Sequence, residues 1–190
     1  MNYLAHAYLS GDNEDLLIGN FIADHLRGND FSAFSEGVVK GILLHRRIDS
    51  FTDAHPLFKS SKRVFYQGFE KYSGVLVDIY FDHFLAKFFQ QYHQESLEVF
   101  SSKVYKVYQN NTHLMPESST RFLNYVIKNA IYQNYSEIKG IETVLKHLSH
   151  RIGHKVALND SIRLFLEAEK TLEGNFISFM IDLRSQGFMA

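Results

Sequence analysis

Apolar residues recur along the chain three or four positions apart, and no stretch alternates with the two-residue period of a half-buried strand. The pattern predicts an all-α protein, a multi-helix bundle of about eight helices folded as a single domain over residues 1–190. Besides a short helix at residues 2–9, a helix is expected to begin between residues 32 and 35 and to run to about residue 54, and the other expected helices cover residues 14–28, 56–69, 74–92, 95–109, 117–134, 137–152 and 160–185.

Residues with known end preferences mark several of these boundaries. Gly28 is expected to close the second helix, since glycine readily adopts the left-handed conformation that ends helices. Pro56 stands where a new helix begins, in the first turn that proline favours. The segment NNTHLMPESST is expected to form a loop, and a break is expected near Tyr132 in the helix that follows it.

The helix expected at residues 35–54 carries polar residues along the face that it should bury. Val38, Ile42, His45, Asp49 and Asp53 follow steps of four, three, four and four, which keeps them on one side of a helix. The first two are core residues by type, and the polar three continue their line. This helix therefore aims a histidine and carboxylates where apolar side chains would be expected.

A second apolar stripe is interrupted in the same way. Val75, Asp78, Asp82, Leu85 and Phe89 follow one another at steps of three or four. Carboxylates in apolar surroundings are costly unless they are paired with a charge or bound to a metal ion. The two aspartates of this stripe therefore become candidates for a buried ionic site.

Two further polar residues stand in apolar surroundings. Asp24 follows Leu17 and Phe21 on one helical face, and His6 lies inside the segment YLAHAYL. Because such residues occur on several helices, we expect them to converge in the folded protein. Their oxygen and nitrogen atoms suit a divalent ion such as Mn²⁺ or Mg²⁺.

Each polar residue also has a simpler explanation when it is taken singly. His6 fits a hydrogen-bonded core histidine, and Asp49 fits an ion pair with Arg46 or Arg47 on its own helix. Asp78 and Asp82 fit pairs with a lysine elsewhere in the chain. The spacing alone leaves both readings open.

Composition narrows the kind of site. The chain has no cysteine, which excludes disulfides and thiolate ligands, and its formal net charge of −1 gives no overall attraction to nucleic acid or anionic membranes. No window of about 20 apolar residues predicts a membrane span, and the N-terminus lacks the basic and apolar regions of a signal peptide. A cytoplasmic protein is expected.

Arginines near the polar stripe are a second indication of the kind of ligand that the site would bind. Arg46 and Arg47 lie about 100° and 200° around the helix from His45, so at most one of them leans toward the same site. A guanidinium beside a divalent ion is suited to holding a phosphate, and Arg27 and Arg151 are other candidates for this role. Neither a GxSxG nucleophile motif nor a glycine-rich phosphate loop ending in GK[ST] is present.

Four segments of the chain, taken in order, resemble the acyl carrier protein phosphodiesterases: MNYLAHAYLS, IGNFIADHLRG, GILLHRRIDSFTDAHP and DIYFDHFLAKFF. That family is distantly similar to the all-helical HD-type metal-dependent phosphohydrolases, so the resemblance implies an HD-domain-like fold. Two features depart from these patterns. Asp82 and His83 reverse the order of the HD dipeptide, and Tyr8 stands where many relatives carry a second histidine.

The resemblance implies hydrolysis of the phosphodiester that joins 4′-phosphopantetheine to a serine of holo-acyl carrier protein, giving apo-carrier and free 4′-phosphopantetheine. It also implies a divalent cation, with Mn²⁺ preferred over Mg²⁺. The catalytic positions carried over by the motifs are His6, Asp24, His45, Arg46, Asp49, Asp78 and His83, and the expected metal ligands are Asp24, His45, Asp49 and Asp82.

Finer roles within this set are hypotheses. Arg46 would stabilise charge on the phosphate, Asp78 would orient the attacking water, and His83 or His6 would protonate the departing serine oxygen. Carrier proteins are acidic, so docking is expected on a basic surface. The candidates are residues 128–155, where Lys128, Lys139, Lys146, Arg151 and Lys155 outnumber Glu137 and Glu142, and the segment KSSKR at residues 59–63.

Two other functions remain open at this stage, and the oligomeric state is not predicted. The first is a related phosphohydrolase that acts on a nucleotide or a small phosphoester with the same metal site. The second is a non-catalytic helical binding module whose polar residues form a buried hydrogen-bond network.

Overall fold

The computed structural model describes residues 1–188, and helices are the only regular secondary structure in this range. The predicted all-α class is confirmed. The elements are α1 (Tyr3–Leu9), α2 (Glu14–Ile22), η1 (Ala23–His25), α3 (Glu36–Ala54), α4 (Pro56–Arg63), α5 (Tyr66–Phe69), η2 (Glu70–Tyr72), α6 (Ser73–Lys87), α7 (Phe89–Tyr92), α8 (Leu97–Asn110), η3 (Thr112–Leu114), α9 (Glu117–Lys128), α10 (Ile131–Asn134), α11 (Ile138–Arg151), η4 (Leu158–Asp160) and α12 (Ser161–Ser185), where η marks 3₁₀ helices.

The expected helices are present, but several are divided, so the helical segments outnumber those predicted. The second does not run to Gly28: its α-helical part ends at Ile22 and tightens into the 3₁₀ turn η1. The break expected near Tyr132 falls at Ala130, whose left-handed backbone (φ 43°) separates α9 from α10. The boundaries of α3 and the first-turn position of Pro56 are as predicted.

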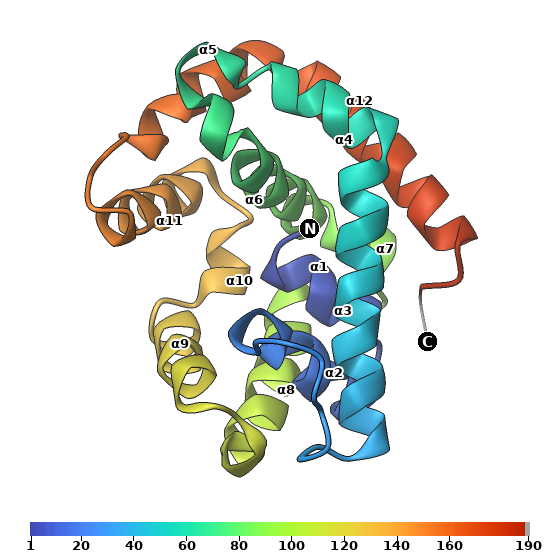
Figure 1. The fold of residues 1–190 in the computed structure, drawn as a ribbon. Helices are drawn as coiled ribbons and strands as arrows, with labels where there is room; N and C mark the ends of the chain where they lie inside the picture. Colours follow the sequence, from blue (N-terminus) through green and yellow to red (C-terminus); the bar gives the residue numbers. More distant parts are fainter. Residues whose placement is uncertain (189–190) are drawn as a thin grey trace.

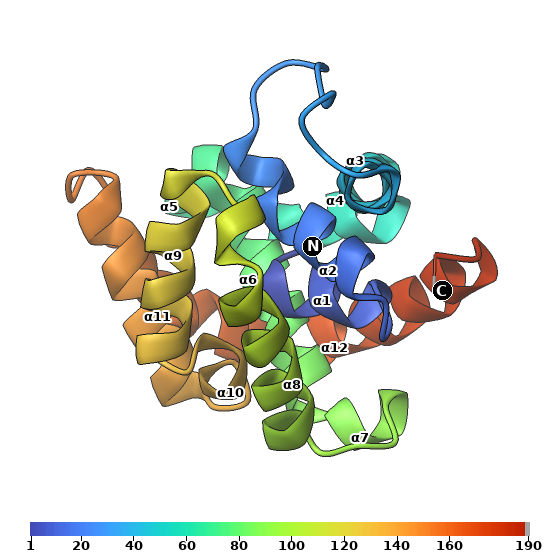
Figure 2. The same ribbon diagram turned by 90° about the horizontal axis from the view of Figure 1, so that it is seen from below.

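The helices form two flanks around a central pair, α1 and α6. Figure 1 shows α3, α4 and α12 on one flank and α9, α10 and α11 on the other. Seen from below, the loop between η1 and α3 projects beyond the helices (Figure 2). In the described residues no helix combines the length and apolar character needed to cross a lipid bilayer.

Aromatic side chains make the core around α6. The Tyr80 ring stacks between Phe65 and Phe165, with ring centroids 5.3 and 4.2 Å away, and Phe81 packs against Phe176 and Phe179 of α12. Large buried rings supply much of the apolar area that drives folding. This packing makes α6 a fixed support for α1.

The buried carboxylate of Asp82 holds α1 in place. Its two oxygens accept hydrogen bonds from the backbone N–H groups of Leu4 (2.8 Å) and Ala5 (3.3 Å), at the start of α1. These are N–H groups that an α-helix leaves without partners in its first turn, where a negative charge also matches the helix dipole. A helix of seven residues would not form alone, so this contact fixes the element that carries His6.

Two glycines bring α2 and α3 into unusually close contact. A Cβ atom added at Gly19 would lie 2.0 Å from the carbonyl oxygen of Val38, and one added at Gly41 would lie 2.6 Å from that of Leu16. Only hydrogen fits at either position. The approach brings Asn20, the residue after Gly19, beside His45, one turn after Gly41.

We expect Gly41→Ala to destabilise the protein by about 1–3 kcal/mol, because the added methyl group overpacks the α2–α3 contact. This loss opposes the gain of about 1 kcal/mol that alanine normally brings to a helix interior. The measurement is chemical denaturation of both proteins, followed by circular dichroism.

Gly174→Ala is the matched control, since it lies within α12 and an added Cβ would meet no atom within 4 Å. It should stabilise the protein by about 0.5–1 kcal/mol. Equal changes in the free energy of unfolding for Gly41→Ala and Gly174→Ala would contradict the close α2–α3 contact.

Candidate metal centre

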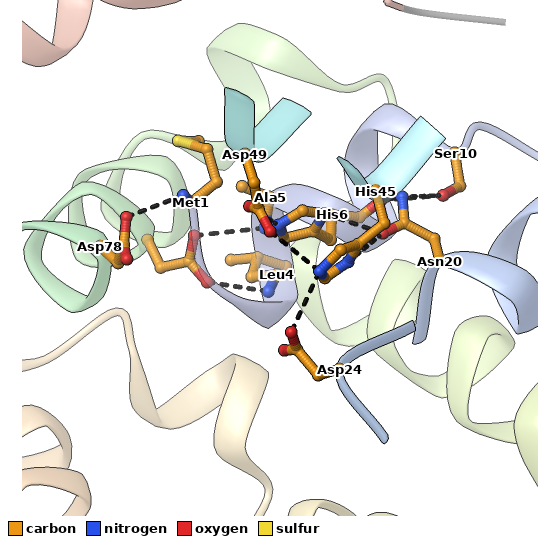
Figure 3. Close-up of polar contacts among 11 residues, drawn as sticks. Met1, Leu4, Ala5, His6, Ser10, Asn20, Asp24, His45, Asp49 and Asp78 are labelled. Atoms are coloured by element: carbon orange, nitrogen blue, oxygen red, sulfur yellow. Dashed lines mark hydrogen bonds and ion pairs between the residues drawn. The ribbon is translucent and has the colours of Figure 1, made fainter. Parts of the chain in front are cut away.

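Five polar side chains from the first two-fifths of the chain meet beside α1. His6 comes from α1, Asn20 from α2, Asp24 from η1, and His45 and Asp49 from α3 (Figure 3). The two imidazole rings stack, with centroids 4.2 Å apart and planes 22° apart. The predicted convergence of Asp24, His45, Asp49 and His6 is therefore present in the structure.

The side chain of Asn20 sets the orientation of both histidines. Its Nδ2 donates to the carbonyl oxygen of His6 (3.1 Å) and to Ser10 Oγ (2.9 Å), so its Oδ1 must be the atom that faces the rings. His6 Nδ1 and His45 Nδ1 lie 2.8 and 3.0 Å from this oxygen. Both Nδ1 atoms therefore carry a proton and donate it to Asn20.

The opposite ring nitrogens point at carboxylates. His6 Nε2 lies 3.1 Å from Asp49 Oδ1, and His45 Nε2 lies 3.0 Å from Asp49 Oδ2 and 3.1 Å from Asp24 Oδ1. His45 and Asp49 are four residues apart on α3, the spacing that places side chains one helical turn apart. Two imidazoles and two carboxylates thus surround one small space.

The charges in this space influence each other strongly. Burial alone would lower the pKa of His45, but hydrogen bonds to Asp24 and Asp49 and their negative charges raise it to about 9. Burial and the charge of His45 lower the pKa of His6. The hydrogen bond from His45 lowers the pKa of the Asp24 carboxyl, and the two histidines hold the pKa of Asp49 below its usual range despite burial.

A neutral His6 cannot satisfy both of its contacts. Once Nδ1 donates to Asn20, the Nε2 lone pair faces Asp49 Oδ1 at 3.1 Å with no proton between them. Two lone pairs at this distance repel each other unless a cation lies between them. A metal ion bound by His6 and His45 through Nε2 would remove this repulsion, and a hydrogen bond from the other ring nitrogen is the usual support for a histidine ligand.

The distances also suit a single ion. Candidate ligand atoms of His6, His45 and Asp49 all lie within 4.8 Å of one another. Ligands held at about 2.1 Å by an octahedral ion are roughly 3.0 Å apart when adjacent and 4.2 Å apart when opposite. Asp24 adds a fourth candidate, and the side chains of Asp24 and Asp49 are 51% and 41% exposed. The carboxylate side is therefore open to water and to a substrate.

Two of the predicted aspartates have other partners in the structure. Asp82, expected as a metal ligand, is fully buried and uses both oxygens on the backbone of α1. Asp78 accepts a hydrogen bond from the amino group of Met1 (2.7 Å), which lies between it and the cluster in Figure 3. These aspartates fix the start of the chain next to the site.

Arg46 and His83 also stand apart from the cluster. Arg46 donates to Asn29 Oδ1 (2.7 Å) and to the carbonyl oxygen of Gly28 (2.8 Å), and its guanidinium lies over the Phe31 ring. It thus ties down the loop that follows Asp24. His83 Nδ1 donates to the carbonyl oxygen of Tyr135 (2.7 Å), and its ring packs edge-on against Phe165.

Asn20 is not among the residues predicted from the sequence, all of which carry charged or titratable side chains. The available signal was a polar residue inside the apolar run LLIGNFI, in which it is buried. A buried amide must find hydrogen-bond partners, so its position alone indicated a structured polar site.

Comparison with known proteins identifies the family. The family model described as acyl carrier protein phosphodiesterase matches residues 1–183. The chain belongs to this family. Proteins named acyl carrier protein phosphodiesterase from Serratia proteamaculans (strain 568) and Yersinia pestis are 30% and 32% identical to it, over 98% and 94% of this chain and 97% and 93% of theirs.

A third protein of that name, from Pectobacterium atrosepticum, is 32% identical over 86% of this chain and 85% of its own length. No solved structure matches the chain. The family resemblance seen in the sequence is therefore confirmed, whereas the HD-domain-like fold stays a prediction.

We expect Mn²⁺ to stabilise the protein against heat. At about 100 times its dissociation constant, an ion that binds only the folded state adds about 2.7 kcal/mol, which corresponds to a rise in Tm of roughly 5–10 °C. Asp49→Asn should abolish this rise. Asn20→Ala should need about 10–100 times more Mn²⁺ for the same rise in Tm, because both histidines lose the acceptor that orients them.

His113→Ala and Asn110→Ala are the controls for these substitutions, since both residues are exposed and lie outside the cluster. Mn²⁺ should raise the Tm of these two variants as much as it raises the Tm of the unmodified protein. The measurement is thermal unfolding in chelator-treated buffer. An undiminished shift in Asp49→Asn would exclude the cluster as the binding site.

Proposed function

We propose that the protein is a metal-dependent phosphodiesterase that releases 4′-phosphopantetheine from the serine of holo-acyl carrier protein. Family membership over nearly the whole chain carries the substrate assignment. The cluster of His6, Asp24, His45 and Asp49 supports the chemistry, since it offers oxygen and nitrogen ligands on a face open to solvent.

His6, His45 and Asp49 would hold the ion, with Asp24 as a further ligand, and Asn20 would keep both rings in the binding tautomer. A divalent ion bound there would act as a Lewis acid on water and on the phosphate oxygens. Mixed imidazole and carboxylate ligands suit Mn²⁺, with Mg²⁺ as the alternative. Asp82 leaves the proposed ligand set, because its oxygens already serve the backbone of α1.

The positions of the side chains bear on the remaining proposed roles. Asp78 stays the candidate for orienting the attacking water, since it is partly exposed and sits beside the amino group of Met1. His83 is set aside as the proton donor because Tyr135 occupies its Nδ1 and its ring packs in the core. Arg46 acts as a positioning residue for the loop after Asp24.

Incubation with holo-carrier and Mn²⁺ should lower the mass of the carrier by the phosphopantetheine group. His45→Ala and Asp24→Ala should reduce this turnover by at least about 100-fold, since each loses a group that contacts the ion. Mass spectrometry of the carrier measures the reaction, and circular dichroism checks that both variants keep their helices.

A nucleotide panel run in parallel tests the rival activity. Turnover of nucleotides without turnover of holo-carrier would replace the proposal with a small-molecule phosphohydrolase. Absence of turnover together with absence of a metal-induced melting shift would favour a non-catalytic binding module.

Helix α11, with Lys139 near its start, and the turn after it, with Lys155, are proposed as the docking surface for the acidic carrier. Lys139 and Lys155 are exposed in this region, whereas Lys146 pairs with Glu142. Opposite charges at the edge of an interface mainly speed association, and salt screens them.

Replacing both Lys139 and Lys155 with Glu should raise KM for holo-carrier by roughly 3–10-fold at low salt and leave a weaker salt dependence. The same exchange at Lys59 and Arg63 of α4 is the control, since these form the alternative basic segment. A larger effect at α4 than at α11 would transfer the docking surface to α4.

A further inference from the structure

We propose that a cavity between α1, α6, α9 and α11 receives the pantetheine arm of the substrate. The proposal rests on the proposed function, and it assigns a place to the part of the substrate that does not react. The cavity has a volume of about 220 Å³. Its apolar wall consists mainly of Tyr3, Val75, Ile79, Phe122, Val144 and Leu148.

The cavity wall includes residues that lie close to the metal centre in the chain or in space. Tyr3 lies on α1 three residues before His6, and its ring packs on Phe122 with centroids 4.6 Å apart. Phe122 in turn packs on His25, the neighbour of Asp24, at 5.7 Å. A phosphate held at the exposed carboxylate side of the cluster would therefore have the cavity beside it.

Arg151 supplies a positive charge at the same place. It lines the cavity at the end of α11, near enough to Tyr3 for its positive charge to lower the pKa of the Tyr3 hydroxyl, against the larger effect of burial. No ion pair joins it to a carboxylate among residues 1–188, so its charge is not neutralised there by a neighbour. A guanidinium in this position suits a phosphate oxygen or an amide carbonyl of a ligand.

The chemical groups of the pantetheine arm match the apolar wall of the cavity and the guanidinium of Arg151. From the phosphate outward, the arm presents two methyl groups on one carbon, then a hydroxyl and two amides, and a thiol at its end. Apolar walls with a few polar groups are the usual lining of a small-molecule site. The volume is below the common range of about 300–1,000 Å³, so the cavity would enclose the portion nearest the phosphate.

A nucleoside is the rival occupant, because the rings of Tyr3 and Phe122 could stack on a base. Direct binding separates the two possibilities and does not depend on turnover. We expect free 4′-phosphopantetheine to bind the Mn²⁺-loaded protein at least about tenfold more tightly than inorganic phosphate and than adenosine monophosphate, as measured by calorimetry.

Val144→Phe should remove this advantage by filling the cavity, so that 4′-phosphopantetheine binds about as weakly as phosphate. Arg151→Gln changes an exposed side chain that poses no risk to folding, and it should weaken 4′-phosphopantetheine binding by about 5–10-fold. Val99→Phe, on an exposed position of α8, is the matched control and should bind as the unmodified protein does.

The outcomes distinguish this proposal from the proposed function. Equal affinities for 4′-phosphopantetheine and phosphate, or unchanged binding in both Val144→Phe and Arg151→Gln, would overturn the cavity assignment even if holo-carrier is cleaved. Tighter binding of adenosine monophosphate would assign the cavity to a nucleoside. Specific binding of 4′-phosphopantetheine that Val144→Phe abolishes would support the assignment even if holo-carrier is not cleaved, in which case only the proposed reaction fails. A melting shift with Mn²⁺ confirms that each variant is folded.

Discussion

The carboxamide of Asn20 is the interaction on which the candidate site depends. One amide group donates twice to the backbone and side chain of the α1 segment and accepts from both histidines. Because its donors are already used, it leaves the histidines no choice of tautomer, and both Nε2 atoms face the carboxylates. This arrangement forms only if α1, α2 and α3 meet at one point. The glycine contact between α2 and α3 and the Asp82 contact at the start of α1 are the two devices that bring them there.

The geometry of the cluster also bears on why carboxylates and imidazoles are brought so close together. Two partly exposed carboxylates beside two buried, stacked imidazoles repel each other and are costly without compensation. In the structure His45 takes a positive charge between Asp24 and Asp49, which offsets part of this cost. Burial lowers the pKa of His6, and a neutral His6 that donates its Nδ1 proton to Asn20 would face Asp49 without a proton to share. A divalent ion held by His6, His45 and Asp49 would satisfy both histidines and this carboxylate at once, which favours a binding site over a buried hydrogen-bond network as the explanation of the cluster.

Spacing along the sequence predicted the helices and part of this site. The apolar stripe of α3 correctly aligned His45 with Asp49, since residues four apart on one helix keep that relation in any fold. The same argument could not separate ligands from structural carboxylates. Asp82 interrupts its stripe just as Asp49 does, yet its partners are backbone N–H groups of another helix. That pairing depends on how α1 packs against α6, which periodicity does not encode. Asp24 reaches His45 after α2 tightens into η1, a change that the expected helix to Gly28 did not include.

The division between buried and exposed groups indicates how the site would meet a substrate. Both histidines and Asn20 are nearly inaccessible to solvent, whereas about half of the Asp24 side chain is exposed. The nitrogen side is therefore rigid, and an ion would present its remaining positions on the carboxylate side. Asp24 lies at the end of a helix, and Arg46 fastens the loop that follows it. The segment that carries Asp24, the more exposed of the two carboxylates, thus has its own anchor near the open side of the site. Under the proposed function, substrate selection would then lie in the cavity of Tyr3 and Phe122 and in the proposed docking surface, because the cluster itself is held by contacts within α1, α2 and α3.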